Sequence, residues 1–146
     1  MAEMDKTQLL GTETKGLKVL VADDIPFGLI YAKKVLSRLN LEVITAVNGQ
    51  EVLDKALSEK PSLLLLELML PVIDGYEVIR RLRSDPQLSQ SRIIVMSALS
   101  TNDNIVRALN LGADDFVVKP IATDKLLKSV LGQIELIRAM EADAKG

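Results

Sequence analysis

The chain has 146 residues, a formal net charge of -2 and a hydrophobic fraction of 48%, values that are typical of a single soluble globular domain. It contains no cysteine and no histidine, which excludes disulfides, thiolate chemistry, histidine-based catalytic triads and histidine-ligated metals. The near-neutral charge and the 3% of aromatic residues argue against direct binding to nucleic acid.

The polarity of the chain predicts its domain limits and its compartment. Residues 1–15 are polar and show no regular pattern, so we expect a flexible N-terminal arm there, a folded domain over residues 16–142 and a short tail over residues 143–146. The start of the chain lacks the apolar segment of a signal peptide. The longest apolar stretch, residues 63–73, is interrupted by Glu67 and Pro71 and is too short to span a membrane. We therefore expect a cytoplasmic protein without a membrane anchor.

The first part of the chain predicts two strands, each followed by a helix. Residues 18–22, KVLVA, form a short run that is apolar from Val19 onward, which is typical of a strand that is buried on both faces. Pro26 suits the first turn of a helix, and helical spacing of apolar residues then continues to Asn40, a residue that commonly ends helices. Residues 42–47 predict the second strand, and Asn48 predicts the N-cap of the next helix.

Three more strand–helix pairs follow. Residues 63–66, 92–96 and 116–118 predict strands. The helix after the first of them is capped by Asp74, and the next covers about residues 102–111. The last helix is long and amphipathic, with apolar residues every three or four positions: Leu127, Val130, Leu131, Ile134 and Ile137. This alternation predicts an α/β fold of the (βα)5 type, a five-stranded parallel sheet sandwiched between two layers of helices.

Polar residues gather where these strands end, and binding sites in such sheets form at the carboxyl ends of the strands. These residues come from four of the five strands: Asp23, Asp24, Glu67, Ser97 and Lys119. Taken singly, the two aspartates could cap a helix and Ser97 could be a turn residue. Glu67 lies within the apolar run LLLLELML and therefore needs a partner, such as a metal ion or Lys119.

The group as a whole has the composition of a phosphoryl-binding site. Clustered carboxylates without histidine or cysteine suit Mg²⁺ or Mn²⁺. A neighbouring hydroxyl and a lysine could then hold a phosphoryl group. A purely structural pairing of Glu67 with Lys119 stays open as the alternative.

Four segments in this order resemble the receiver domain of bacterial two-component response regulators, of the chemotaxis type: VLVADD, LLLLELMLPVIDG, VMSA and FVVKP. The resemblance covers about residues 17–139. It implies the flavodoxin-like strand order 2-1-3-4-5 and a role in phosphorelay signalling rather than catalysis.

The resemblance also implies a role for each site residue. Asp23 and Asp24, the carboxylate of Glu67 and the backbone carbonyl of Met69 would bind Mg²⁺ or Mn²⁺ weakly. Ser97 and Lys119 would contact the phosphoryl group. Ser97 would act as a conformational switch together with the aromatic Phe116.

One position departs from the family pattern, because the phosphoacceptor of receivers is an aspartate and this chain has Glu67. A glutamate carboxylate reaches ~1.5 Å further, and a misplacement of ~1 Å can slow a reaction ~10²-fold. We therefore expect a phosphomimetic or non-phosphorylatable form. Glu67 would be native in a receiver that no longer takes phosphate, or a substitution made to mimic or block phosphorylation, or a native acceptor that is still phosphorylated.

Partners follow from the same resemblance. The expected phosphodonor is a histidine kinase or phosphotransfer protein in trans, and the expected target is a downstream protein or output domain. The exposed side of the last helix is expected to support a weak homodimer. Two rival classes stay open: a Mg²⁺-dependent phosphatase with an aspartate nucleophile, and a flavodoxin-like cofactor binder. The first lacks its Asp-x-Asp motif, since Ile25 stands where the second aspartate would be. The second lacks a glycine-rich phosphate loop.

Overall fold

The structure of the chain is a computed structural model that describes residues 14–145. The expected N-terminal arm lies outside the described residues, except for Thr14 and Lys15. The strands are β1 (Lys18–Ala22), β2 (Glu42–Ala46), β3 (Leu63–Leu66), β4 (Arg92–Ser97) and β5 (Asp115–Val118). The helices are α2 (Pro26–Leu36), the 3-10 helix η1 (Ser37–Leu39), α3 (Gly49–Glu59), α4 (Gly75–Ser84), α5 (Asn102–Leu111) and α6 (Thr123–Lys145).

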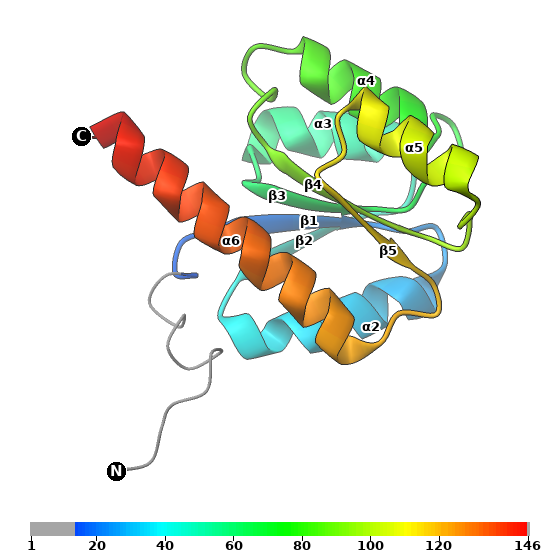
Figure 1. The fold of residues 1–146 in the computed structure, drawn as a ribbon, viewed down its shortest axis with the longest axis horizontal. Helices are drawn as coiled ribbons and strands as arrows, with labels where there is room; N and C mark the ends of the chain where they lie inside the picture. The colour runs from blue at the N-terminus through cyan, green and yellow to red at the C-terminus, as the bar shows by residue number, and fades with distance from the viewer. Residues whose placement is uncertain (1–13, 146) are drawn as a thin grey trace.

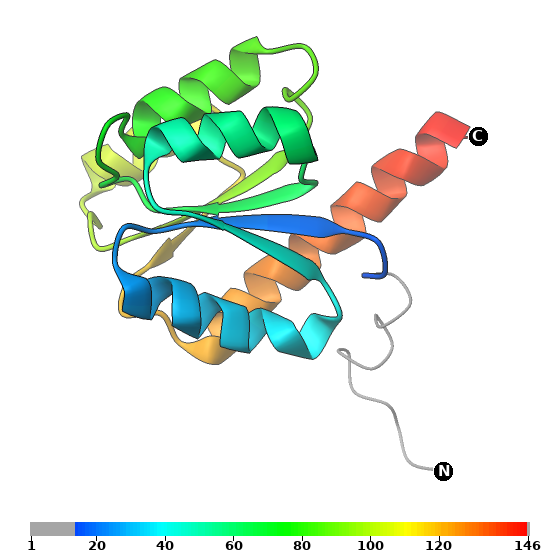
Figure 2. The ribbon, with the colours of Figure 1, turned by 180° about the vertical axis from the view of Figure 1, so that it is seen from behind.

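The five strands form one parallel sheet in the order β2-β1-β3-β4-β5. Helices α2 and α6 cover one face of this sheet, and α3, α4 and α5 cover the other (Figures 1 and 2). The predicted three-layer (βα)5 sandwich and its strand order are therefore confirmed. The chain crosses from one face to the other between β1 and β3, so the loops that follow these two neighbouring strands diverge and leave room for a site.

Each face of the sheet packs its own apolar core, because alternate strand residues point to opposite sides. In β3, Leu63 and Leu65 join the core beneath α2 and α6, while Leu64 and Leu66 join the core beneath α3, α4 and α5. All four leucines are at most 1% exposed. This double burial is the reason why the central strands are continuous apolar runs without alternation.

The helix starts agree with the sequence except at α2. The Asn48 side chain accepts a hydrogen bond from the Glu51 N–H at 2.8 Å, and Asp74 accepts one from the Glu77 N–H at 2.9 Å. Helix α2 begins at Pro26 as expected, but its N-cap is Ile25, which makes no side-chain cap. The aspartates before α2 therefore do not cap it. Within residues 14–145, no helix has the length and apolar character that crossing a membrane requires.

Arg83 connects α4 to the loops that precede β4 and β5. These loops lie at the amino end of the strands, opposite the predicted site. Its guanidinium donates to the carbonyls of Gly112, Ser89 and Ser91 and to the Asp114 carboxylate. The Arg83 and Asp114 side chains are only 20% and 16% exposed. Burial lowers the pKa of Arg83, and the charge of Asp114 opposes this shift.

We expect Arg83→Met to lower the free energy of unfolding by ~2–4 kcal/mol, because it leaves three carbonyls without their side-chain donor. Asp114 keeps Arg92 and the Ile93 N–H as partners. Arg80→Met on the exposed side of α4 is the matched control. It removes only the surface pair with Glu77 and should cost at most ~1 kcal/mol. Urea denaturation of both variants checks this, and equal losses would contradict the central role of Arg83.

Candidate functional site

Two carboxylates from neighbouring strands meet one lysine at the carboxyl end of the sheet. Asp23 follows β1, Glu67 follows β3 and Lys119 follows β5. The Lys119 Nζ donates to Asp23 Oδ2 at 2.7 Å and to Glu67 Oε1 at 3.2 Å. The strand register explains the meeting, since Ala22 lies opposite Leu66 and the Glu67 N–H donates to the Ala22 carbonyl. We call Asp23, Glu67 and Lys119 the ion triad.

The two carboxylates of the ion triad are buried, the Lys119 side chain is 23% exposed, and the formal charge of the triad is one negative. Asp23 is 0% exposed and Glu67 is 6% exposed. Burial pushes the pKa of Lys119 downward, but its hydrogen bond to Asp23 and the charges of Glu67 and Asp23 outweigh this effect and raise the pKa above its usual value. The lysine is therefore held as a cation, which is what two desolvated carboxylates require.

The remaining carboxylate oxygens of the triad accept backbone hydrogen bonds. Asp23 Oδ1 accepts from the Ile25 N–H at 3.0 Å, and Glu67 Oε2 accepts from the Leu68 N–H at 2.6 Å. Each of the four oxygens thus has a donor within the chain. The expected partnership of Glu67 with Lys119 is present, and Glu67 is not an unsatisfied buried charge.

Gly28 in the first turn of α2 makes room for the Asp23 carboxylate. A Cβ atom at this position would lie 2.1 Å from Asp23 Oδ2. We expect Gly28→Ala to displace the carboxylate from Lys119 and to lower stability by ~1–3 kcal/mol.

Gly132→Ala in α6 is the matched control, because a Cβ there meets nothing within 4 Å. It should raise stability by ~0.5–1 kcal/mol through its better helix propensity. Thermal unfolding of the two variants measures both effects, and a stabilised Gly28→Ala would contradict the close approach of α2 to Asp23.

Ser97 lies at the end of β4 and is fully buried. Its Oγ accepts a hydrogen bond from the Leu99 N–H at 3.2 Å, and its carbonyl accepts from the Lys119 N–H at 3.0 Å. Across the described part of the chain, the Glu67 carboxylate accepts hydrogen bonds from Lys119 and from the Leu68 N–H, and the Ser97 hydroxyl is not among its partners. Ser97 thus belongs to the rim of the site but does not contact the carboxylate.

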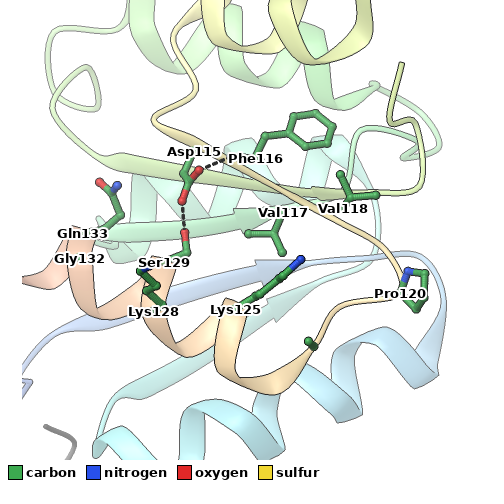
Figure 3. A pocket seen from close by; sticks show the side chains of 11 residues that line it. Asp115, Phe116, Val117, Val118, Pro120, Lys125, Lys128, Ser129, Gly132 and Gln133 are labelled. Carbon is green, nitrogen blue, oxygen red and sulfur yellow. Dashed lines mark hydrogen bonds between the residues drawn. The ribbon is translucent and has the colours of Figure 1, made fainter. Parts of the chain in front are cut away.

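Phe116 lies on β5, partly buried against the core beneath α3, α4 and α5. It also lines a hollow of about 470 Å³ between β5 and α6. Figure 3 shows this hollow with Asp115, whose carboxylate accepts hydrogen bonds from the Phe116 N–H and the Ser129 hydroxyl. Phe116 therefore lies on β5, the strand that Lys119 directly follows, and it is not part of the ion triad.

The predicted metal ligands fall into two groups. Asp23 and Glu67 converge on one cation, the Lys119 ammonium, whereas Asp24 is exposed and Met69 is 58% exposed in the loop after β3. No group of three acidic side chains within residues 14–145 is close enough to hold a metal ion. The donor atoms are hard oxygens that fit Mg²⁺, provided that Lys119 gives up its place between the two carboxylates.

Two residues beside the ion triad were missed from the sequence, Gly28 and Tyr31. The Tyr31 hydroxyl donates to the Ile121 carbonyl at 2.8 Å and lies 2.9 Å from Thr123 Oγ1. Both residues border a cavity of about 300 Å³ between α2 and the loop after β5, together with Asp23, Phe27 and Lys119. A glycine inside a predicted helix was the one sequence signal that could have drawn attention to this contact.

Comparison with known proteins gives a consistent result. The family described as "Response regulator receiver domain" matches residues 19–131. The transcriptional regulatory protein PhoP of Bacillus subtilis is 37% identical over 122 residues, which cover 82% of this chain and 50% of that protein. The chain therefore spans about half the length of the curated relatives that it matches.

Solved structures agree with this family in their fold. The receiver domain of a Francisella response regulator is 28% identical and superposes with a TM-score of 0.76, covering 82% of this chain and 98% of that one. The chemotaxis response regulator CheY4 of Vibrio cholerae is 26% identical with a TM-score of 0.75, covering 80% of this chain and 98% of that one.

Proposed function

The chain belongs to the response regulator receiver domain family of two-component signalling, and from this premise we propose that Glu67 occupies the position at which receivers are phosphorylated. The observation that carries the proposal is the ion triad, in which Lys119 bridges Glu67 and Asp23. The receiver unit would cover residues 16–142. Its role would be signalling, since family membership favours this over the rival phosphatase class.

We propose further that the chain is a non-phosphorylatable form in which Glu67 stabilises an inactive-like state. A phosphomimetic carboxylate would have to engage the switch hydroxyl of Ser97. Both oxygens of Glu67 are instead occupied by Lys119 and the Leu68 N–H. One additional charge-assisted hydrogen bond is worth ~1.5–3 kcal/mol, whereas a full population switch needs ~5.5 kcal/mol. Even a Glu67 carboxylate that exchanged one of these bonds for one to Ser97 would therefore activate the domain only partially through Ser97 and Phe116.

The residues that would hold Mg²⁺ are Asp23, Asp24, Glu67 and the Met69 carbonyl. The ion would supply positive charge to offset that of an incoming phosphoryl group. Lys119 already neutralises part of this site, so the ion has to compete with the ammonium for Asp23 and Glu67. This competition supports weak binding, in addition to the reluctance of Mg²⁺ to lose its waters.

We expect an NMR titration with Mg²⁺ to shift the amides at Asp23, Asp24, Glu67 and Met69 with millimolar affinity. Asp24→Asn should weaken the titration severalfold, because this exposed carboxylate is not held by Lys119. Asp103→Asn on exposed α5 is the control and should leave the affinity unchanged. Shifts confined to other parts of the chain would contradict the proposed metal ligands.

The proposed partners are those of a receiver. A histidine kinase or phosphotransfer protein would act in trans and would bind the exposed face at the start of α2. There Ile25, Phe27 and Ile30 are 56%, 74% and 64% exposed. Such an apolar patch beside the site suits a protein partner. The output would be a downstream protein or a further domain, and a weak homodimer would use the exposed side of α6. A cytoplasmic location is part of the same proposal.

A further inference from the structure

The Tyr31 hydroxyl joins α2 to the loop between β5 and α6. A tyrosine hydroxyl has one donor and can also accept, so it donates to the Ile121 carbonyl at 2.8 Å and accepts from the Thr123 hydroxyl at 2.9 Å. Ile121 in the loop and Thr123 at the start of α6 are 90 and 92 positions away in sequence. This contact therefore connects an element near the start of the domain to the segment that carries Lys119.

Lys119 is held on both sides along the chain. On one side, its own N–H donates to the Ser97 carbonyl at 3.0 Å, which continues the pairing of β4 with β5. On the other side, Pro120 has no N–H to donate, so the next anchored group is the Ile121 carbonyl bound by Tyr31. The Tyr31 contact thus marks the point at which the loop after Lys119 is attached to the rest of the domain.

Packing beside Lys119 is incomplete, although the Ile121 side chain contacts the core beneath α2 and α6. A cavity of about 300 Å³ lies between α2 and the loop and is lined by Asp23, Gly28, Tyr31, Lys119 and Ile121. Side chains therefore do not fill the space next to the lysine stem. The Tyr31 hydroxyl connects α2 to this segment, and the Asp23 carboxylate connects the loop after β1 to Lys119.

We propose that Tyr31 is a positioning residue for Lys119: by holding the loop at Ile121 and Thr123, it keeps the lysine ammonium between Asp23 and Glu67. The inference rests on the proposed function in one respect only, the role of Lys119 in contacting a phosphoryl group. The Tyr31 ring also stacks on Phe27, with ring centroids 6.4 Å apart. Phe27 is 74% exposed. A partner that touches Phe27 at the surface of α2 is therefore linked to the Lys119 segment through the side chains of Phe27 and Tyr31.

The test compares two tyrosines that each lose one hydroxyl. Tyr31→Phe keeps the ring and removes the bonds to the loop. Tyr76→Phe is the control, since the Tyr76 hydroxyl also joins two elements, through Asn104 at 2.9 Å, but does not contact the site. NMR measures exchange with water for the Lys119 ammonium protons and for the Lys119 and Ile121 amides, and amides of β1 and β3 report on the whole domain.

We expect Tyr31→Phe to accelerate exchange of the Lys119 ammonium about fivefold to tenfold, the loss that one hydrogen bond accounts for, with β1 and β3 unchanged. Thr123→Val should produce a smaller change at the same signals, because the bond to Ile121 remains. Tyr76→Phe should change none of them. The inference would be overturned if Lys119 exchange were unaltered in both Tyr31→Phe and Thr123→Val, or if exchange accelerated uniformly across the sheet.

This measurement requires neither bound metal nor phosphorylation. The proposed function fails if the metal titration fails or if Glu67→Asp does not become phosphorylated, and the exchange rates in the unmodified chain are independent of both. The two proposals can therefore be contradicted separately.

Discussion

Replacing Lys119 with methionine is expected to destabilise the domain by ~3–5 kcal/mol near neutral pH, a large part of the ~5–15 kcal/mol that typically stabilises a domain. The substitution leaves Asp23 and Glu67, at 0% and 6% exposure, as like charges without a cation. Each keeps one backbone donor, from Ile25 and from Leu68, so the loss comes from the missing charge rather than from missing hydrogen bonds alone. Urea denaturation measures the difference.

Lys125→Met is the control for this variant. Lys125 is exposed and borders the hollow between β5 and α6, so its loss should change stability by no more than ~0.5 kcal/mol. A loss below ~1 kcal/mol in Lys119→Met would contradict a buried ion triad, because one unpaired buried charge alone costs more than that.

The pH dependence of stability gives a second measure of the same triad. The pKa of Lys119 is raised above 10.5 in the folded state. A group with a raised folded pKa stabilises the protein fully below its unfolded pKa, and the contribution disappears as the pH rises through the folded value. The unmodified chain should therefore lose stability as the pH rises above about 10.5, and Lys119→Met should lack that part of the loss.

Local patterns in the sequence were sufficient to predict the strands, the helices and the fold class. Buried parallel strands are continuous apolar runs, and the caps at Asn48 and Asp74 are short-range hydrogen bonds within four residues. The strand order needed the family resemblance, because nothing in a single run of residues specifies which strand lies beside it. The N-cap of α2 was open to a wrong interpretation, since aspartates before a proline usually suggest capping. The Asp23 carboxylate instead accepts hydrogen bonds from the Ile25 N–H and from Lys119.

The three residues of the ion triad could be selected from the sequence, but their contacts could not. Asp23, Glu67 and Lys119 could be selected because strand ends converge on one rim. Which oxygen of each carboxylate meets the lysine depends on side-chain rotamers and on backbone atoms from distant segments. The Tyr31 contact spans 90 residues and the Arg83 contact with Asp114 spans 31. Neither has a local sequence signature, because tyrosine and arginine are common on helices whether or not they bind anything.

Shortening Glu67 to aspartate is expected to give the largest change of all, at least ~10²-fold more phosphorylation by a small phosphodonor with Mg²⁺. The glutamate places its carboxylate about one C–C bond, ~1.5 Å, too far along, and both of its oxygens are bound by Lys119 and the Leu68 N–H. Aspartate would withdraw the carboxylate toward β3 and leave room for a phosphoryl group near Ser97 and Lys119. Glu67→Gln is the matched control, which keeps the length of the side chain and removes the nucleophilic charge.

Mass spectrometry after incubation with acetyl phosphate and Mg²⁺ shows directly whether position 67 accepts a phosphoryl group. We expect an acyl phosphate on the Glu67→Asp variant, mapped to position 67, and little or none on the unmodified chain or on Glu67→Gln. Labelling of the unmodified chain at Glu67 to the extent seen in Glu67→Asp would contradict this expectation, as would a Glu67→Asp variant that stays unlabelled.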